Sequence, residues 1–276
     1  MKNIDTIFLG VVQGLTEFLP VSSSGHLVFF QNLLGFREPE LLLDCSLHLG
    51  TLLAVCLYFR SDLKMMAVEI WQAVAVTLNA RPQSGGTGLR VMIEKPHANL
   101  VLWVLVGSIP TGLIGLVFKS SIEGLFGSIT VVGLMLITTG IIVASTRLIP
   151  ESHGTRTQVG LAAALAIGVV QGLAIMPGIS RSGATIACGL LFGLDRNLAG
   201  RFSFFLSIPA IIGAVAIQLN VQALEKVGLV PLLLGSASSA IVGLFALRLL
   251  MGMVKKGHLY YFAPYCWAVG LTAILA

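Results

Sequence analysis

The segment 10–26, GVVQGLTEFLPVSSSGH, holds the residues best suited to chemistry, because it places a carboxylate, three serines and a histidine in an otherwise apolar sequence. Gln13 and Glu17 are four residues apart, so on a helix they share one face and can bind one target together. A carboxylate at such a site can hold a divalent cation. The structural alternatives are a salt bridge for Glu17 and an interhelical hydrogen bond for Gln13.

Hydroxyl and backbone NH groups follow directly after Pro20, where a short helix is predicted to begin, in Ser22, Ser23, Ser24 and Gly25. The first NH groups of a helix are unpaired and lie at the positive end of its dipole, so such a site binds anions. Simple capping by serine is the alternative. His26 comes next and can serve as general acid, general base or nucleophile. A buried histidine with satisfied hydrogen bonds is the alternative for that residue.

A second polar group interrupts the apolar sequence further along, in the segment PGISRSGAT. It offers a cation, hydroxyls and a glycine, in Ser180, Arg181, Ser182, Gly183 and Thr185. The planar guanidinium of arginine suits phosphate oxygens, and its burial without an anion is costly. An internal ion pair between Arg181 and Glu17 is the alternative. Together, a carboxylate, an arginine, helix N-termini and a His/Ser pair indicate phosphoryl transfer or hydrolysis.

The elements that position these residues are predicted to be membrane helices. Of the 276 residues, 56% are hydrophobic and only 11% are charged, and the mean hydropathy is +0.93. This composition is too apolar for a soluble domain and indicates an all-α integral membrane protein, because unpaired backbone groups in lipid are costly. The net charge of +5 comes from basic residues in short loops, so it reports topology and not a nucleic-acid partner.

Six apolar segments are predicted to cross the membrane: 41–59, 99–118, 129–145, 198–219, 229–250 and 259–275. Two further units are broken, 7–19 with 27–34 around Pro20, and 159–176 with 182–194 around PGISRSG. Each half is too short to span the bilayer, which favours re-entrant helix pairs with tips buried in protein.

The first crossing carries two ionisable residues, Asp44 and His48, four positions apart near its start. Because they lie near a membrane face, we interpret them as a secondary hydrogen-bonded pair outside the predicted site. The segment 65–80 is predicted to be a helix that lies at the membrane interface or dips into it.

An internal duplication relates the two broken units. GVVQGL occurs at 10–15 and again at 168–173, and at the same spacing Ser22, Ser24 and Gly25 correspond to Ser180, Ser182 and Gly183. A weaker echo pairs GSIPTGLIGL at 107–116 with GSASSAIVGL at 235–244. We therefore predict one membrane domain, 1–276, with repeat one at about 1–146 and repeat two at about 159–276, joined by a short cytoplasmic loop.

Loop charge predicts the topology. Six crossings alternate without exception if the basic loops are cytoplasmic, namely 60–98, 147–158, 195–201 and 252–258. Each repeat is then a re-entrant hairpin followed by three crossings, and because three is odd, the second repeat is inverted. Hairpins that enter from opposite faces meet near the midplane, as in inverted-repeat transporters.

The two polar motifs resemble the signatures of the bacterial undecaprenyl-diphosphate phosphatase family, also known as the bacitracin-resistance protein family, and the resemblance covers essentially the whole chain. It implies removal of the terminal phosphate from undecaprenyl diphosphate, which recycles the lipid carrier for peptidoglycan and other envelope polymers. By position, the family's (E/Q)xxxE motif corresponds to Gln13 and Glu17, its serine and histidine to Ser23 and His26, and PGxSRSxxT to 177–185. Many members have a second glutamate where this chain has Gln13.

The resemblance also implies dependence on Mg²⁺ or Ca²⁺, a multi-pass location in the bacterial cytoplasmic membrane, and an active site that faces the periplasm. In the resulting hypothesis Glu17, assisted by Gln13, holds the cation, while Arg181 and the two serine-rich tips bind the diphosphate. The predicted diphosphate contacts are Ser22, Ser24, Gly25, Ser180, Ser182, Gly183 and Thr185. Ser23 or His26 attacks phosphorus, or His26 activates Ser23 or water; the sequence leaves this choice open.

A transporter or flippase of the polyprenyl phosphate carrier is the rival function, because inverted repeats occur mainly in transporters. A carrier, however, needs no His/Ser pair beside a carboxylate and an arginine. A purely structural membrane subunit leaves Glu17, His26 and Arg181 unexplained. The expected partners are the polyprenyl diphosphate lipid and the bilayer, and the sequence leaves a homodimer open.

Overall fold

The computed structural model describes residues 3–35, 41–79, 88–125, 128–150, 153–218 and 228–275, and these residues are helical with short connections. The predicted all-α class is confirmed for them. Residues 80 and 219, which end two predicted helices, lie outside these ranges. The helices are α1 (Asn3–Phe18), α2 (Ser23–Leu33), α3 (Leu41–Tyr58), α4 (Arg60–Asn79), α5 (Gly88–Glu94), α6 (Pro96–Val117), α7 (Lys119–Leu125), α8 (Ile129–Ser145), α9 (Leu161–Leu173), α10 (Arg181–Leu191), α11 (Arg196–Gln218), α13 (Leu229–Lys255) and α14 (Ala263–Leu275), with 3₁₀ turns η1 (Thr146–Leu148) and η3 (Leu259–Phe262).

Both units predicted to be broken are broken. α1 has 16 residues and stops at Phe18, because Pro20 disfavours helical backbone just before it, and α2 then has 11 residues. In the second unit α9 has 13 residues and α10 has 11, with a turn through Gly178 at positive φ between them. All four helices are shorter than the roughly 20 residues that a crossing needs.

Four helices are long and apolar enough to cross a membrane, among the residues described: α6, Ile129–Leu148 (α8 with η1), Arg196–Ile217 within α11, and α13. They match four of the six predicted crossings, and this is a multi-pass membrane protein. The predicted crossing 41–59 is α3, which is bent by 76° against α4, so that the pair together forms either one broken span or a re-entrant loop. The predicted crossing 259–275 is a shorter apolar helix, Leu259–Leu275.

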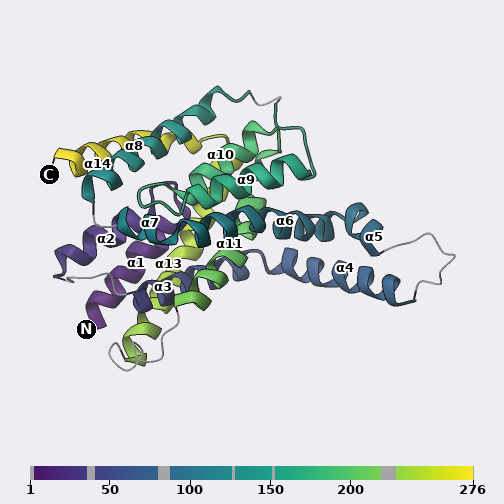
Figure 1. The fold of residues 1–276 in the computed structure, drawn as a ribbon, viewed down its shortest axis with the longest axis horizontal. Helices are drawn as coiled ribbons and strands as arrows, with labels where there is room; N and C mark the ends of the chain where they lie inside the picture. Colours follow the sequence, from purple (N-terminus) through teal and green to yellow (C-terminus); the bar gives the residue numbers. More distant parts are fainter. Residues whose placement is uncertain are drawn as a thin grey trace.

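α4 begins at Arg60, earlier than the predicted interfacial helix 65–80, and continues almost directly from α3. In Figure 1, α4 and α5 extend together from one end of the helical body. α8 and α14 lie side by side along another edge, and α1, α3 and α13 pack against one another. Phe18 of α1 meets Phe204 of α11 edge to face, with ring centroids 5.6 Å apart, in the largest buried cluster.

Corresponding glycines of the two sequence repeats make corresponding contacts. A side chain at Gly10 of α1 would collide with the carbonyl oxygen of Gly235 in α13, and one at Gly168 of α9 would collide with that of Gly107 in α6. Gly10 corresponds to Gly168, and Gly107 to Gly235, in the duplicated sequence. The first helix of each repeat therefore packs closely on a helix of the other repeat, as small residues allow in membranes.

Gly168→Ala is expected to lower the melting temperature of the protein in detergent. The added methyl group has no room beside the Gly107 carbonyl, and such overpacking costs about 1–3 kcal/mol. Gly112→Ala, in α6, is the matched control, because a side chain there meets nothing within 4 Å. Thermal unfolding followed by intrinsic fluorescence measures both variants, and equal melting temperatures would contradict the close contact.

Candidate active site

The breaks in the two hairpins lie against each other. A side chain at Gly183, in the first turn of α10, would reach within 2.9 Å of the Cβ of Pro20. A side chain at Gly25, in the first turn of α2, would reach within 3.9 Å of the Cα of Gly178. The close approach brings the polar residues of segments 17–26 and 178–185 together, as the sequence predicts.

Two outer helices hold these tips in place. Thr139 of α8 donates a hydrogen bond to the Gly178 carbonyl and accepts one from the Ser180 NH, both at 2.9 Å. On the other tip, the Cys266 thiol of α14 donates to the Pro20 carbonyl at 3.1 Å. Because backbone groups at a helix break lack helical partners, these bonds stabilise the two tips within the bundle.

Glu17 is the centre of the site. Its Oε1 accepts a hydrogen bond from Nη2 of Arg181 at 2.5 Å. Its Oε2 accepts one from the Ser23 hydroxyl at 2.6 Å and one from Nε2 of Gln13 at 3.0 Å. The side chains of Glu17 and Arg181 are 5% and 18% exposed, respectively, so the ion pair is largely removed from solvent. The structure therefore brings together four residues that the sequence analysis singled out.

Gln13 of the first repeat and its counterpart Gln171 in the second repeat have different surroundings. Gln13 is fully buried and faces the Glu17 carboxylate, and its Oε1 has no hydrogen-bond partner among the described residues. Gln171 is also buried with an unpartnered Oε1, but its Nε2 donates to the Leu206 carbonyl and to the Thr111 hydroxyl. An interhelical hydrogen bond was the alternative interpretation for Gln13, but it is Gln171 that makes such bonds.

The first tip has an unusual backbone. Ser22 is the residue before α2 and has φ of +67°, a left-handed conformation that costs a non-glycine residue about 1–2 kcal/mol. Its hydroxyl makes no capping bond to α2 and instead lies 3.3 Å from the Ser24 hydroxyl. Capping by Ser22, the structural alternative, is therefore wrong, and the start of α2 has no side-chain cap.

The second tip is conventionally capped. The Ser180 hydroxyl accepts from the Gly183 NH at 3.1 Å and lies 3.2 Å from the Ser182 hydroxyl. The Thr185 hydroxyl lies 2.6 Å from the Ser203 hydroxyl and donates to the Arg181 carbonyl. These polar groups support the start of α10, and thereby the position of Arg181, through bonds within the protein.

His26 lies beside the Glu17 network and outside it. Its Nδ1 is 2.8 Å from the Ser22 carbonyl, and its Nε2 is 2.7 Å from the hydroxyl of Tyr265, on which the imidazole stacks. Within the described part of the chain, neither ring nitrogen bonds to Glu17, Ser23 or Arg181. The contacts match the buried, satisfied histidine that was the alternative, and they connect the first tip to α14.

His48 is a residue that the sequence analysis named but placed outside the predicted site. Its Nε2 lies 3.6 Å from Oε2 of Glu17, and its Nδ1 lies 2.7 Å from the backbone carbonyl of Asp44. The predicted pairing of Asp44 with His48 therefore involves the main chain, while the Asp44 carboxylate accepts from Gln31. The rule that picked out Glu17, an ionisable residue in an apolar helix, applies equally to His48, and its expected position near a membrane face was the wrong reason to place it outside the site.

The Glu17 carboxylate and the unpartnered amide oxygen of Gln13 are oxygen ligands of the kind that a hard divalent cation takes. No group of three or more His, Cys, Asp and Glu residues that could hold a metal occurs among the described residues. Mg²⁺, however, commonly uses only one or two carboxylates and completes its shell with water and substrate phosphates. Glu17 and the unpartnered amide oxygen of Gln13 provide such a partial set of oxygen ligands.

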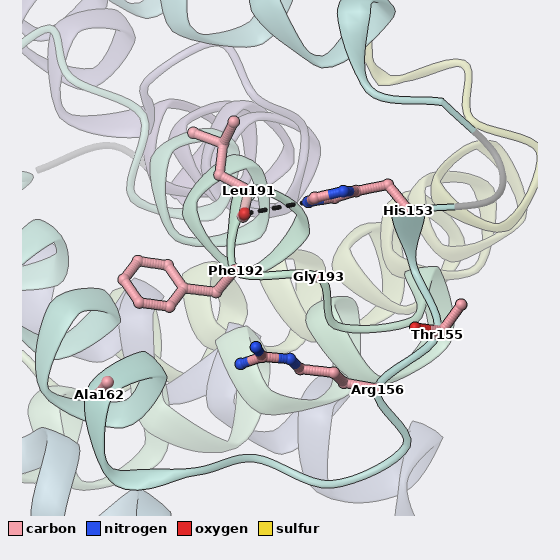
Figure 2. Close-up of a pocket in the computed structure, with 7 residues that line it drawn as sticks. All are labelled: His153, Thr155, Arg156, Ala162, Leu191, Phe192 and Gly193. Carbon is pink, nitrogen blue, oxygen red and sulfur yellow. Dashed lines mark hydrogen bonds between the residues drawn. The ribbon is translucent and has the colours of Figure 1, made fainter.

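A pocket on another part of the molecule has different chemistry (Figure 2). It lies where α10 ends, and its lining residues are His153, Thr155, Arg156, Ala162, Leu191, Phe192 and Gly193. His153 Nε2 is 3.2 Å from the Leu191 carbonyl, and the Arg156 side chain extends below Phe192. These lining residues include no carboxylate, and none of them belongs to the Glu17 network.

Fold and site together define a class: a multi-pass helical membrane protein in which two broken helical units bring a buried glutamate, an arginine and a serine together. The chain matches the family described as bacitracin resistance protein BacA over residues 6–272 and belongs to that family. It is 44% identical to the undecaprenyl-diphosphatase of Desulfatibacillum aliphaticivorans and 46% identical to that of Desulforapulum autotrophicum, over 100% of this chain and 99% of each relative. The undecaprenyl-diphosphatase of Desulfosudis oleivorans is 46% identical over 98% of this chain and 97% of the relative.

Proposed function

We propose that this protein hydrolyses undecaprenyl diphosphate to undecaprenyl phosphate and inorganic phosphate, and so recycles the lipid carrier for peptidoglycan and other envelope polymers. The observation that carries the proposal is the buried ion pair of Glu17 with Arg181, with the Ser23 hydroxyl on the second carboxylate oxygen. The full-length relatives named undecaprenyl-diphosphatase support the same activity.

Arg181 binds and orients the diphosphate. A guanidinium has five NH donors in a planar fork, and Glu17 accepts a hydrogen bond from Nη2. Within the described ranges Glu17 is the partner of this guanidinium, so its remaining donors are available for phosphate oxygens. The NH groups at the uncapped start of α2, near Ser24 and Gly25, supply further neutral donors for a phosphate group.

Ser23 is the better supported nucleophile, because it donates to Glu17 at 2.6 Å, whereas His26 is occupied by Ser22 and Tyr265. In the proposed step, the Ser23 proton moves to Oε2 of Glu17, the serine oxygen bonds to the terminal phosphorus, and the bond from that phosphorus to the bridging oxygen breaks. Undecaprenyl phosphate leaves, and water then hydrolyses the phosphoserine to release inorganic phosphate.

Mg²⁺ or Ca²⁺ would be held by Glu17 and Gln13, and when bound it supplies charge neutralisation for the phosphate oxygens. Arg181 also neutralises phosphate charge, from the opposite side of the Glu17 carboxylate. Its guanidinium bonds to Oε1, whereas Gln13 and Ser23 face Oε2.

We propose that the two repeats have inverted topologies and that the site opens to the outer face of the bacterial cytoplasmic membrane. The distribution of basic loops supports this orientation. The exchange of contacts between the repeats, α1 on α13 and α9 on α6, supports a pseudo-twofold relation. The proposed orientation can be tested by introducing single cysteines into the loops 147–158 and 252–258 and labelling them with a membrane-impermeant reagent. Both loops should react only from the cytoplasmic side.

Ser23→Ala is expected to reduce phosphate release from undecaprenyl diphosphate by about 100-fold or more, because the hydroxyl is the attacking group. Brief reaction with substrate labelled in the terminal phosphate, followed by acid quench and peptide mapping, should place the label on Ser23 in the wild-type protein. Ser108→Ala, which removes a hydroxyl bonded within α6, is the control and should retain both turnover and label. Label on His26 would overturn the assignment of the nucleophile.

A carrier function for the polyprenyl phosphate is supported by the exchanged contacts of the two repeats, which are typical of transporters. Sealed liposomes with substrate in one leaflet distinguish the two activities. Phosphate release in detergent indicates hydrolysis, whereas movement of lipid between leaflets without phosphate release indicates transport alone.

A further inference from the structure

We propose that Tyr265 of α14 is a positioning residue for Ser23. It acts through His26, whose ring holds the left-handed backbone of Ser22, and that backbone places the Ser23 hydroxyl beside Glu17. This inference rests on the proposed function, in which Ser23 attacks phosphorus, and it names a residue outside both broken units on which the attack depends.

The backbone of Ser22 is held by the side chain of His26. Ser22 is the only residue other than glycine with a positive φ among the described residues, and such a conformation persists only where its surroundings enforce it. The Ser22 carbonyl oxygen lies 3.4 Å from the backbone nitrogen of His26 and only 2.8 Å from Nδ1 of the same residue. A carbonyl can only accept, so Nδ1 donates to it whatever the charge of the ring. The imidazole therefore provides the shorter of the two bonds that fix this carbonyl.

Tyr265 in turn fixes the orientation of the imidazole. Its hydroxyl lies 2.7 Å from Nε2 of His26, and the two rings stack with 10° between their planes. A hydroxyl both donates and accepts, so the contact exists with the neutral and with the charged ring. His26 is only 9% exposed. Removal of the hydroxyl leaves a largely buried nitrogen without this partner, which favours another orientation of the ring.

The second repeat lacks this histidine and has an ordinary backbone at the same place. In the duplicated sequence, Ser180 corresponds to Ser22 and Ala184 corresponds to His26. Ser180 has φ of −78°, and its hydroxyl caps α10. The left-handed serine therefore occurs in the repeat that has the imidazole, and the capping serine occurs in the repeat that has alanine.

The other anchors of the two tips are alike. The Pro20 carbonyl accepts from the Cys266 thiol of α14 at 3.1 Å, and the Gly178 carbonyl accepts from the Thr139 hydroxyl of α8 at 2.9 Å. Pro20 and Gly178 correspond in the duplicated sequence. These matched anchors do not explain why the two backbones differ, whereas an imidazole with a tyrosine partner is a feature of the first tip.

The conformation of Ser22 determines where the nucleophile lies. Ser23 is the next residue and the first of α2, and its hydroxyl donates to Oε2 of Glu17 at 2.6 Å. A return of Ser22 to negative φ redirects the chain at this point and moves that hydroxyl away from the carboxylate. The left-handed conformation is disfavoured about 5–30-fold, so loss of its support should lower the rate of attack by a factor of this size.

The test measures phosphate release from undecaprenyl diphosphate by the purified full-length protein in detergent. Tyr265→Phe keeps the stacked ring and removes the hydroxyl, so kcat should fall about 10-fold. KM should stay close to that of the wild type, because Tyr265 is not a phosphate ligand. Tyr261→Phe is the matched control and should behave like the wild type, since it removes a hydroxyl from a tyrosine that contacts another histidine ring, that of His258.

A second background separates positioning from a general structural effect. Glycine adopts positive φ without steric cost, so the Ser22→Gly protein does not need the imidazole to hold this backbone. Tyr265→Phe should therefore lower kcat much less in the Ser22→Gly protein than in the wild type. An equal loss in both backgrounds overturns the inference, because the hydroxyl would then act by a route other than the Ser22 backbone.

The remaining outcomes also decide the matter. A kcat equal to that of the wild type in Tyr265→Phe overturns the inference. If this variant folds poorly, the rate at which Ser23 is labelled in a single turnover with excess enzyme replaces kcat, since that rate does not depend on the folded fraction; labelling as fast as in the wild type overturns the inference. Absence of phosphate release from the wild type would reject the proposed function itself, whereas equal release by the wild type and Tyr265→Phe rejects only this inference.

Discussion

Arg181→Ala is expected to lower the rate of phosphate release from undecaprenyl diphosphate by about 1,000-fold or more, the range found for arginines that stabilise phosphoryl transfer. Arg181 is the first residue of α10 and reaches across the junction of the two tips to Glu17. Its removal takes away both the donor fork for phosphate and the cation that positions the carboxylate. Steady-state assays in detergent, with free phosphate as the readout, measure the effect.

Two further variants make this result specific. Arg181→Lys keeps the charge but loses the planar fork, so we expect only partial recovery. Arg156→Ala removes an exposed arginine from the pocket of Figure 2, outside the Glu17 network, and should leave turnover unchanged. Turnover close to wild type in Arg181→Ala, in protein that elutes as a folded species, would refute the proposed site.

Glu17→Ala is expected both to abolish activity and to destabilise the fold. Without the carboxylate, the Ser23 hydroxyl and the largely buried guanidinium of Arg181 lose their shared partner. Breaking one side of a buried ion pair costs about 3–5 kcal/mol, because a charge remains without compensation. Glu17→Gln keeps the shape of the side chain and separates the two effects, since it should fold better but remain inactive.

A double-mutant cycle checks the origin of the destabilisation. The double variant Glu17→Ala with Arg181→Ala removes both charges, so it should melt at a higher temperature than the sum of the two single effects predicts. Strict additivity would mean that the two side chains do not interact in the folded protein. Thermal unfolding in one detergent at fixed salt gives all four melting temperatures.

The sequence by itself determined the membrane class, the two breaks, the duplication and most of the Glu17 network. The apolar composition and the length of the apolar segments directly indicate burial in lipid. Pro20 and the PGISRSG segment interrupt helices through local backbone chemistry. The cost of burying a lone charge requires a partner for Glu17 and for Arg181. That argument named the ion pair between Glu17 and Arg181 only as the alternative to a bound phosphate, and the structure shows the pair together with the Ser23 hydroxyl on the same carboxylate.

Only the tertiary structure decided which of several similar residues join the site. His26 and His48 both stand in apolar helices, yet the packing of α14 pairs His26 with Tyr265, while α3 places His48 beside Glu17. Gln13 and Gln171 are identical in local sequence, but only Gln13 faces a carboxylate. The 76° bend between α3 and α4 is likewise absent from hydropathy. Periodicity and composition describe one segment at a time, whereas these choices depend on which helix packs against which.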